Sequence, residues 1–186
     1  AGEDFSALDA VAVTNGPGAF TGLRIGRAAA RGLALAGRLP CLAVTTLEAV
    51  AAGVPEAELH ERQLLVVLDA KRADVYAQAF APDLTPMGEP RALLPDELPT
   101  LLMAGGKGRD RCAVVVAGDA AGRALAALDA AGITAIRSAA LDSPDAAVVA
   151  GLAAARWTPG AMVAKPRPLY LRQPSTTTPK KRRRTR

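Results

Sequence analysis

The first fifty residues alternate between short apolar runs and one long segment with helical periodicity. An apolar run from Leu8 to Thr14 ends at a glycine- and proline-rich turn, residues 15–18, and from about Thr21 the apolar positions repeat with a helical period. Another apolar run follows from Pro40 to Val44. This order predicts a strand, a glycine turn, a helix and a second strand that is parallel to the first, with a right-handed crossover.

The predicted helix carries small residues at every fourth position. Gly22, Gly26, Ala30 and Ala34 are spaced four apart, which places them on one slowly drifting stripe of the helix. Each helix glycine costs about 1 kcal/mol relative to alanine, and the close approach of a second backbone would offset that cost. The second backbone belongs either to this chain or to a partner.

Strands and helices continue to alternate along the rest of the chain. The apolar runs predict further strands at Leu64–Leu68, Val75–Phe80, Ala113–Ala117 and Ile133–Ile136, and the helical patterns cover Thr46–Ala52, Ala120–Ala131 and Pro144–Trp157. We expect Thr46 to cap the first of these helices and Pro144 to lie in the first turn of the last. The turn between the first two of these strands predicts an antiparallel hairpin.

Three stretches without clear periodicity divide the chain. Residues 54–62 are charged and predict a domain boundary, residues 81–110 predict loops with an edge strand, and Lys165–Arg172 predicts an extended closing segment. The pattern predicts an α/β protein of two lobes, residues 1–55 and 56–172, followed by a disordered basic tail, residues 173–186.

The net charge of +5 belongs to the tail. Its six lysines and arginines leave 17 basic residues against 18 acidic ones in the rest of the chain. The tail is either a solvated end or a non-specific contact for RNA phosphates. Only six aromatic residues occur, so the sequence predicts no base-stacking platform, and charges interrupt every apolar run before it could span a membrane.

Candidate catalytic chemistry is sparse. His60 is the only histidine, no Gly-x-Ser-x-Gly motif occurs, and the glycines at 105–108 lack the spacing of a phosphate-binding loop. Cys41 and Cys112 each lie in an apolar run, which predicts two buried thiols in the reducing cytoplasm. Neither catalytic nor metal-ligating residues are predicted.

Three sequence blocks resemble one known family. They are GPGAFTGLRIGRAAARGLALAGRLPCLAVTTLEAVA at residues 16–51, LLVVLDAKRADVYAQAF at residues 64–80 and PRPLYLR at residues 166–172. All three are similar to blocks of the bacterial tRNA threonylcarbamoyladenosine biosynthesis family TsaB, also called YeaZ. The resemblance implies a two-lobed actin/sugar kinase/Hsp70-like (ASKHA) fold. The family's first three strands and first helix would precede Leu8, so we expect a first lobe that is truncated at its N-terminus.

The resemblance also implies a function. Proteins of this family act as scaffold subunits with a TsaD-like transferase and a TsaE-like ATPase, which together attach a threonylcarbamoyl group to an adenosine of tRNA. The donor is threonylcarbamoyl adenylate. The transferase carries a His-x-x-x-His metal pair where this chain has Thr46 and Val50, so we expect a chain that is not an enzyme. We expect no cofactor on this chain alone, ATP or ADP at a complex interface, tRNA bound through the complex, and a homodimer as an alternative assembly.

The family resemblance and the small-residue stripe together give the predicted sites. The partner interface is predicted at Phe20, Gly22, Leu23, Gly26, Arg27, Ala30 and Leu33, and Thr21 and Arg24 are the residues expected near a nucleotide. Two alternative functions are a glycoprotease-like metallopeptidase and an ASKHA-type small-molecule kinase. For the kinase, Asp69 and Asp119 follow strands but lack a supporting motif.

Overall fold

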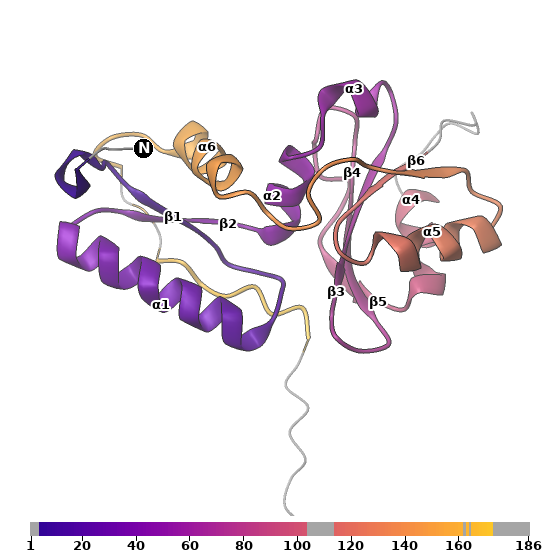
Figure 1. Cartoon of the computed structure of the whole chain (residues 1–186), viewed down its shortest axis with the longest axis horizontal. Coiled ribbons are helices and arrows are strands. Elements are labelled where there is room, and N and C mark those ends of the chain that lie inside the picture. Colours follow the sequence, from indigo (N-terminus) through magenta and orange to yellow (C-terminus); the bar gives the residue numbers. More distant parts are fainter. Residues whose placement is uncertain (1–3, 104–113, 162, 164, 173–186) are drawn as a thin grey trace, which may run out of the picture.

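A computed structural model describes residues 4–103, 114–161, 163 and 165–172 (Figure 1). The chain forms two separate sheets, one of two strands and one of five. Residues 105–108, Cys112 and the basic tail lie outside the described residues. Within the described part, no helix is both long and apolar enough to cross a membrane.

The first sheet is a parallel pair between two helices. β1 (Val11–Thr14) pairs with β2 (Cys41–Val44), as predicted, and α1 (Phe20–Gly37) connects them. In Figure 1, α1 lies on one face of this sheet and α6 (Ala146–Arg156) lies on the other. Apolar side chains of the strands fill the space towards α6, where Val149 and Ala153 are buried. The chain therefore returns to the first sheet near its end, whereas the sequence placed all of residues 56–172 in the second lobe.

The second sheet has the strand order β5-β4-β3-β6-β7. Its strands are β3 (Leu64–Asp69), β4 (Val75–Phe80), β5 (Arg91–Leu93), β6 (Val114–Ala117) and β7 (Ala135–Arg137). The hairpin β3–β4 is antiparallel, as predicted, and β5 is the expected edge strand on the other side of β4. β6 and β7 run parallel to β3.

Helices cover both faces of the second sheet, and the continuous apolar sequence of its central strand follows from this. α2 (Thr46–Ala52) and α3 (Glu56–Leu59) lie on one face, and α4 (Pro99–Met103) and α5 (Ala121–Ala130) lie on the other. Alternate residues of β3 are buried in the two cores, Leu65 in one and Val66 in the other, and both are fully buried.

Several predicted boundaries were wrong for identifiable reasons. Thr45, not Thr46, caps α2, because the glutamate three residues later completes a capping box with it. Asp145 caps α6, so Pro144 lies before the helix rather than in its first turn. The charged connection contains α3, and the proline-rich stretch contains a 3-10 turn (Pro95–Glu97) and α4. These helices are too short to leave a periodic signal.

Candidate functional site

The predicted site lies on α1, whose sides differ in what covers them. At 3.6 residues per turn, each step of four residues advances about 40° around the helix axis, so three steps advance about 120°. The predicted stripe therefore rotates from solvent into the core. Gly22 and Gly26 are exposed, whereas Ala30 and Ala34 are each only 6% exposed.

The exposed end of the stripe is open. A Cβ built on Gly26 meets no atom within 4 Å, and one built on Gly22 meets only the methyl group of Ala19 at 3.9 Å. Leu33 is 52% exposed and Ile25 is 66% exposed on the same side of the helix. We call Gly22, Ile25, Gly26 and Leu33 the glycine flank. It is an apolar surface with little side-chain bulk.

Three of the predicted interface residues make contacts within the chain itself. Ala30 is buried against the chain's own fold, so its assignment to a partner surface was wrong. Leu23 is half-buried and turns back towards the glycine turn, where its side chain lies 3.2 Å from a Cβ built on Gly16. Arg27 donates a hydrogen bond to the carbonyl of Pro166, which ties α1 to the closing segment. Phe20, Gly22, Gly26 and Leu33 remain open.

The two residues expected near a nucleotide lie in the first turns of α1, and both are exposed. The Arg24 guanidinium lies 3.6 Å from the centre of the Phe20 ring, a cation–π contact. The Tyr170 ring, from the closing segment, lies 6.0 Å from the Phe20 ring between centroids. Thr21 contributes no side-chain cap, because the N-cap residue is Ala19. Sequence reasoning missed Tyr170, which is 150 residues away from Phe20 along the chain.

The closing segment is held along α1 by main-chain contacts. The Leu169 amide donates a 2.8 Å hydrogen bond to the Asn15 carbonyl, and the Leu169 carbonyl lies 2.9 Å from a Cβ built on Gly16. Gly16 has φ +114°, so this turn needs glycine for both its backbone angle and its clearance. Further on, Arg172 pairs with Asp74 of the β3–β4 hairpin. Residues 165–172 thus bridge the two sheets.

The polar groups at the carboxyl end of β2 serve the local structure. The Glu48 carboxylate accepts hydrogen bonds from the backbone and the hydroxyl of Thr45, at 3.0 and 2.9 Å, and lies 3.3 Å from Arg156. Burial raises the pKa of Glu48, but these donors outweigh it and hold the pKa below its ordinary value. Thr46 and Val50 are the positions where the transferase family carries its His-x-x-x-His metal pair. Here they are a threonine and a fully buried valine.

The aspartates considered for a kinase are held in turn contacts. Asp119 accepts a 2.7 Å hydrogen bond from the Asp69 amide, and Asp69 accepts hydrogen bonds from the amide and ammonium of Lys71. The Lys71 donors lower the pKa of Asp69. Among the described residues, no group of three or more histidine, cysteine or acidic side chains has the geometry to hold a metal ion.

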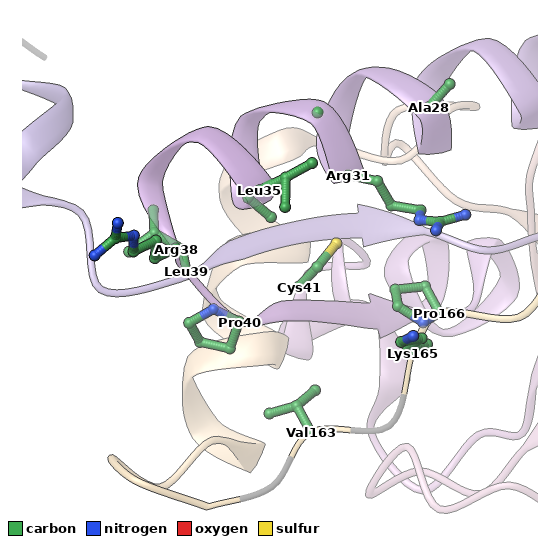
Figure 2. Close-up of a pocket in the computed structure, with 12 residues that line it drawn as sticks. Ala28, Arg31, Leu35, Arg38, Leu39, Pro40, Cys41, Val163, Lys165 and Pro166 are labelled. Carbon is green, nitrogen blue, oxygen red and sulfur yellow. The ribbon is translucent and has the colours of Figure 1, made fainter.

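A surface pocket of about 740 Å³ lies beside the other flank of α1 (Figure 2). It is bounded by the second half of α1, the start of β2 and the closing segment. In Figure 2, Arg31 and Lys165 lie at one end, Arg38 lies at the other, and Cys41 lies between them. The Cys41 thiol is half-buried rather than buried as predicted, and burial raises its pKa.

Comparison with known proteins gives concordant results. A family model described as "TsaD: tRNA N6-adenosine threonylcarbamoyltransferase" matches residues 1–113. The tRNA threonylcarbamoyladenosine biosynthesis protein TsaB of Escherichia coli K12 is 38% identical over 82 residues, which is 44% of this chain and 35% of that protein. TsaB of Haemophilus influenzae is 40% identical over 70 residues, 37% of this chain and 29% of that protein. The matches thus span about a third of the length of these curated relatives.

Similar solved structures cover much more of the chain. YeaZ from Pseudomonas aeruginosa superposes with a TM-score of 0.66 at 28% identity, over 91% of this chain and 77% of that one. A second structure, of a protein described as similar to peptidase YEAZ from Pseudomonas aeruginosa, has a TM-score of 0.63 at 27% identity, over 92% and 77%. These similarities confirm the predicted two-lobed ASKHA fold class.

Proposed function

We propose that this chain, a member of the family described as tRNA N6-adenosine threonylcarbamoyltransferase, works as a scaffold subunit in threonylcarbamoyladenosine synthesis. Its relatives identify it as a member of the TsaB (YeaZ) type. Its partner in this proposal is a TsaD-like transferase, with a TsaE-like ATPase in the same complex. The tRNA is bound through that complex in the cytoplasm.

The open glycine flank of α1 is the observation that carries this proposal. Gly22 and Gly26 remove side-chain bulk where two apolar side chains, Ile25 and Leu33, are more than half exposed. Exposed apolar surface of this kind is typical of protein–protein contacts. A second helix can approach such a flank more closely than an ordinary helix surface, which accounts for two glycines that cost helix stability.

The proposed subunit is not the catalyst. Thr46 and Val50 supply no imidazole at the positions where the transferase family carries its histidine pair, and Val50 is buried in the core. A nucleotide, ATP or ADP, would be held between subunits rather than by this chain alone. Thr21 and Arg24 are exposed in the first turns of α1, so they are the residues we propose to lie nearest to the nucleotide.

Co-purification with the transferase tests the proposal. The variant Gly26→Leu fills the open space with a branched side chain, and overpacking of a contact by this much costs about 1–3 kcal/mol, or about 5- to 150-fold in affinity. Gly122→Leu in α5 is the matched control, because Gly122 is also an exposed helix glycine with no atom within 4 Å of a built Cβ. We expect only Gly26→Leu to lose the transferase.

Two results would contradict the proposal. Retention of the transferase by Gly26→Leu, at wild-type affinity, would show that the glycine flank is not the contact. Modification of tRNA by the purified chain without any partner would show that it is a catalyst. A homodimer through the same flank is the alternative assembly when the transferase is absent, and Gly26→Leu would then yield a monomer.

A further inference from the structure

The flank of α1 opposite the glycines carries a row of cations. Arg24 and Arg31 are seven residues apart in α1, so they differ by only about 20° around the helix axis and by about 10 Å along it, and Arg38, the C-cap residue, follows directly after the helix end. All three side chains are exposed. The closing segment adds Lys165 beside the pocket that Arg31 and Arg38 line. We call these four residues the cationic flank.

No ion pair in the described part of the chain involves this flank. No acidic residue occurs between Asp9 and Glu48 or after Asp145, so all 18 acidic residues lie outside the segments that build it. α1 and the closing segment therefore contribute basic side chains and no acidic ones to this surface, and an acidic segment, the turn around Phe5, packs against Gly37 at the end of α1.

An aromatic pair stands at the N-terminal end of this flank. Phe20 is 54% exposed and Tyr170 is 49% exposed, with Arg24 over the Phe20 ring. Two of the six aromatic residues are thus brought together on the surface by the closing segment. Exposed aromatic rings and arginine planes beside a basic groove are the elements that bind unstacked bases and the backbone of single-stranded RNA.

We propose that the cationic flank binds RNA, with phosphates on Arg31, Arg38 and Lys165 and an unpaired base stacked on the Phe20–Tyr170 pair. The choice of RNA as the polyanion rests on the proposed function, because the curated relatives are tRNA threonylcarbamoyladenosine biosynthesis proteins. Gly22 lies about 180° around α1 from Arg31, so RNA on this flank and a transferase on the glycine flank occupy different sides of the helix.

The closing segment sets the geometry of the flank. The Arg27 side chain donates a hydrogen bond to the Pro166 carbonyl, and the Leu169 amide donates one to the Asn15 carbonyl, so residues 166–169 are fixed at one end to α1 and at the other to the turn after β1. Pro166 is buried, while Lys165 and Tyr170 on either side are exposed. The segment therefore presents Lys165 and the Tyr170 ring beside α1, with Arg167 as a further exposed cation between them, and Arg27 acts as a positioning residue rather than a phosphate ligand.

Fluorescence anisotropy with a labelled RNA anticodon stem-loop tests the phosphate part. All variants keep the full chain, so the contribution of the basic tail stays constant. The double variant Arg31→Ala/Arg38→Ala should lower the affinity. It should also reduce the magnitude of the slope of log affinity against log salt by about 1.4, because two phosphate contacts are lost and each contributes about 0.7 on single-stranded RNA. The control Arg72→Ala/Arg91→Ala removes the same charge from two exposed positions of the second lobe and should leave the slope unchanged.

The aromatic part has its own readout. Tyr170→Ala should weaken binding about 5- to 150-fold, the loss expected for one stacked base, without changing the salt slope. Tyr170→Phe keeps the ring and should restore the wild-type affinity. A structural role of the hydroxyl group would instead make the phenylalanine variant as weak as the alanine variant.

Three outcomes would overturn the inference. One is absence of binding by the wild-type chain at about 50 mM salt, where phosphate contacts are strong. Another is an equal slope for the flank and control variants. The third is displacement of the RNA by polyglutamate at equal charge concentration together with no effect of Tyr170→Ala, which would identify an acidic protein surface as the ligand. Gly26→Leu should lose the transferase but bind RNA with wild-type affinity. Failure of the transferase proposal and failure of the RNA proposal are therefore distinguished by separate measurements.

Discussion

The glycine flank leads to a quantitative prediction about the isolated chain. Replacing Gly26 by alanine adds one methyl group where no atom lies within 4 Å, so the substitution removes the flexibility of glycine without a clash. Alanine is more favourable than glycine in a helix interior by about 1 kcal/mol. We therefore expect Gly26→Ala to raise the free energy of unfolding by about 1 kcal/mol and Tm by about 2–4 °C.

The assay is urea unfolding followed by circular dichroism, with thermal unfolding as a second measurement. Gly122→Ala in α5 is the control, because its surroundings are equally open and its gain should be of similar size. If the glycine flank is a contact surface, Gly26→Ala should combine this gain in stability with weaker binding of the transferase. Gly122→Ala should gain stability and keep the transferase.

A loss of stability in Gly26→Ala would refute this reasoning. It would mean that the added methyl group meets atoms that are not part of the single chain, such as those of a second copy. Repeating the measurement across a range of protein concentrations separates the cases, since only self-association makes the midpoint depend on concentration.

Four further predictions follow from local geometry. Gly118→Ala should destabilise the chain by more than about 2 kcal/mol in urea unfolding, because φ is +104° and a Cβ would lie 2.3 Å from the Val67 carbonyl oxygen. Thr45→Ala should cost about 1 kcal/mol through loss of the helix cap. The folded pKa of Glu48 is below its ordinary value of 4.5, so its stabilising effect is complete above that pH and is lost as the pH falls through the folded pKa. Glu48→Gln should show a smaller loss of stability in this acid range. The Cys41 thiol should react with an alkylating reagent near neutral pH more slowly than a free thiol, because burial raises its pKa; a rate equal to that of free cysteine would contradict the half-buried position.

The sequence predicted those parts of the fold whose signal is local. Strands such as β3 were predicted from continuous apolar runs, and the parallel pairing of β1 with β2 followed from the helix between them. The capping residue of α2 was also readable, because Thr45 and Glu48 have the spacing of a capping box, yet Thr46 was chosen.

The sequence could not predict what the closing segment does. Its contacts with α1, from Arg27 to Pro166 and from Phe20 to Tyr170, join residues about 140 to 150 positions apart, and no periodicity encodes such a pairing. The small-residue stripe was recognised, but its rotation into the core at Ala30 depends on which side of α1 faces the sheet. Helical periodicity separates the glycine flank from the cationic flank, and the three-dimensional arrangement adds which side of α1 is buried between them.

The arrangement of α1 explains why one helix could serve two ligands together. Its buried side, with Ala34, holds it against the first sheet, and the two remaining flanks lie on either side of that contact. A transferase on Gly22 and Gly26 leaves Arg31 uncovered, because about 140–180° of rotation around α1 separates Arg31 from the two glycines, and Arg38 lies past the end of the helix. The two ligands should therefore bind without competition at α1, and RNA bound beside a docked transferase would lie along the same subunit that positions the enzyme. Competition between the transferase and the RNA stem-loop for the wild-type chain would show that this separation fails.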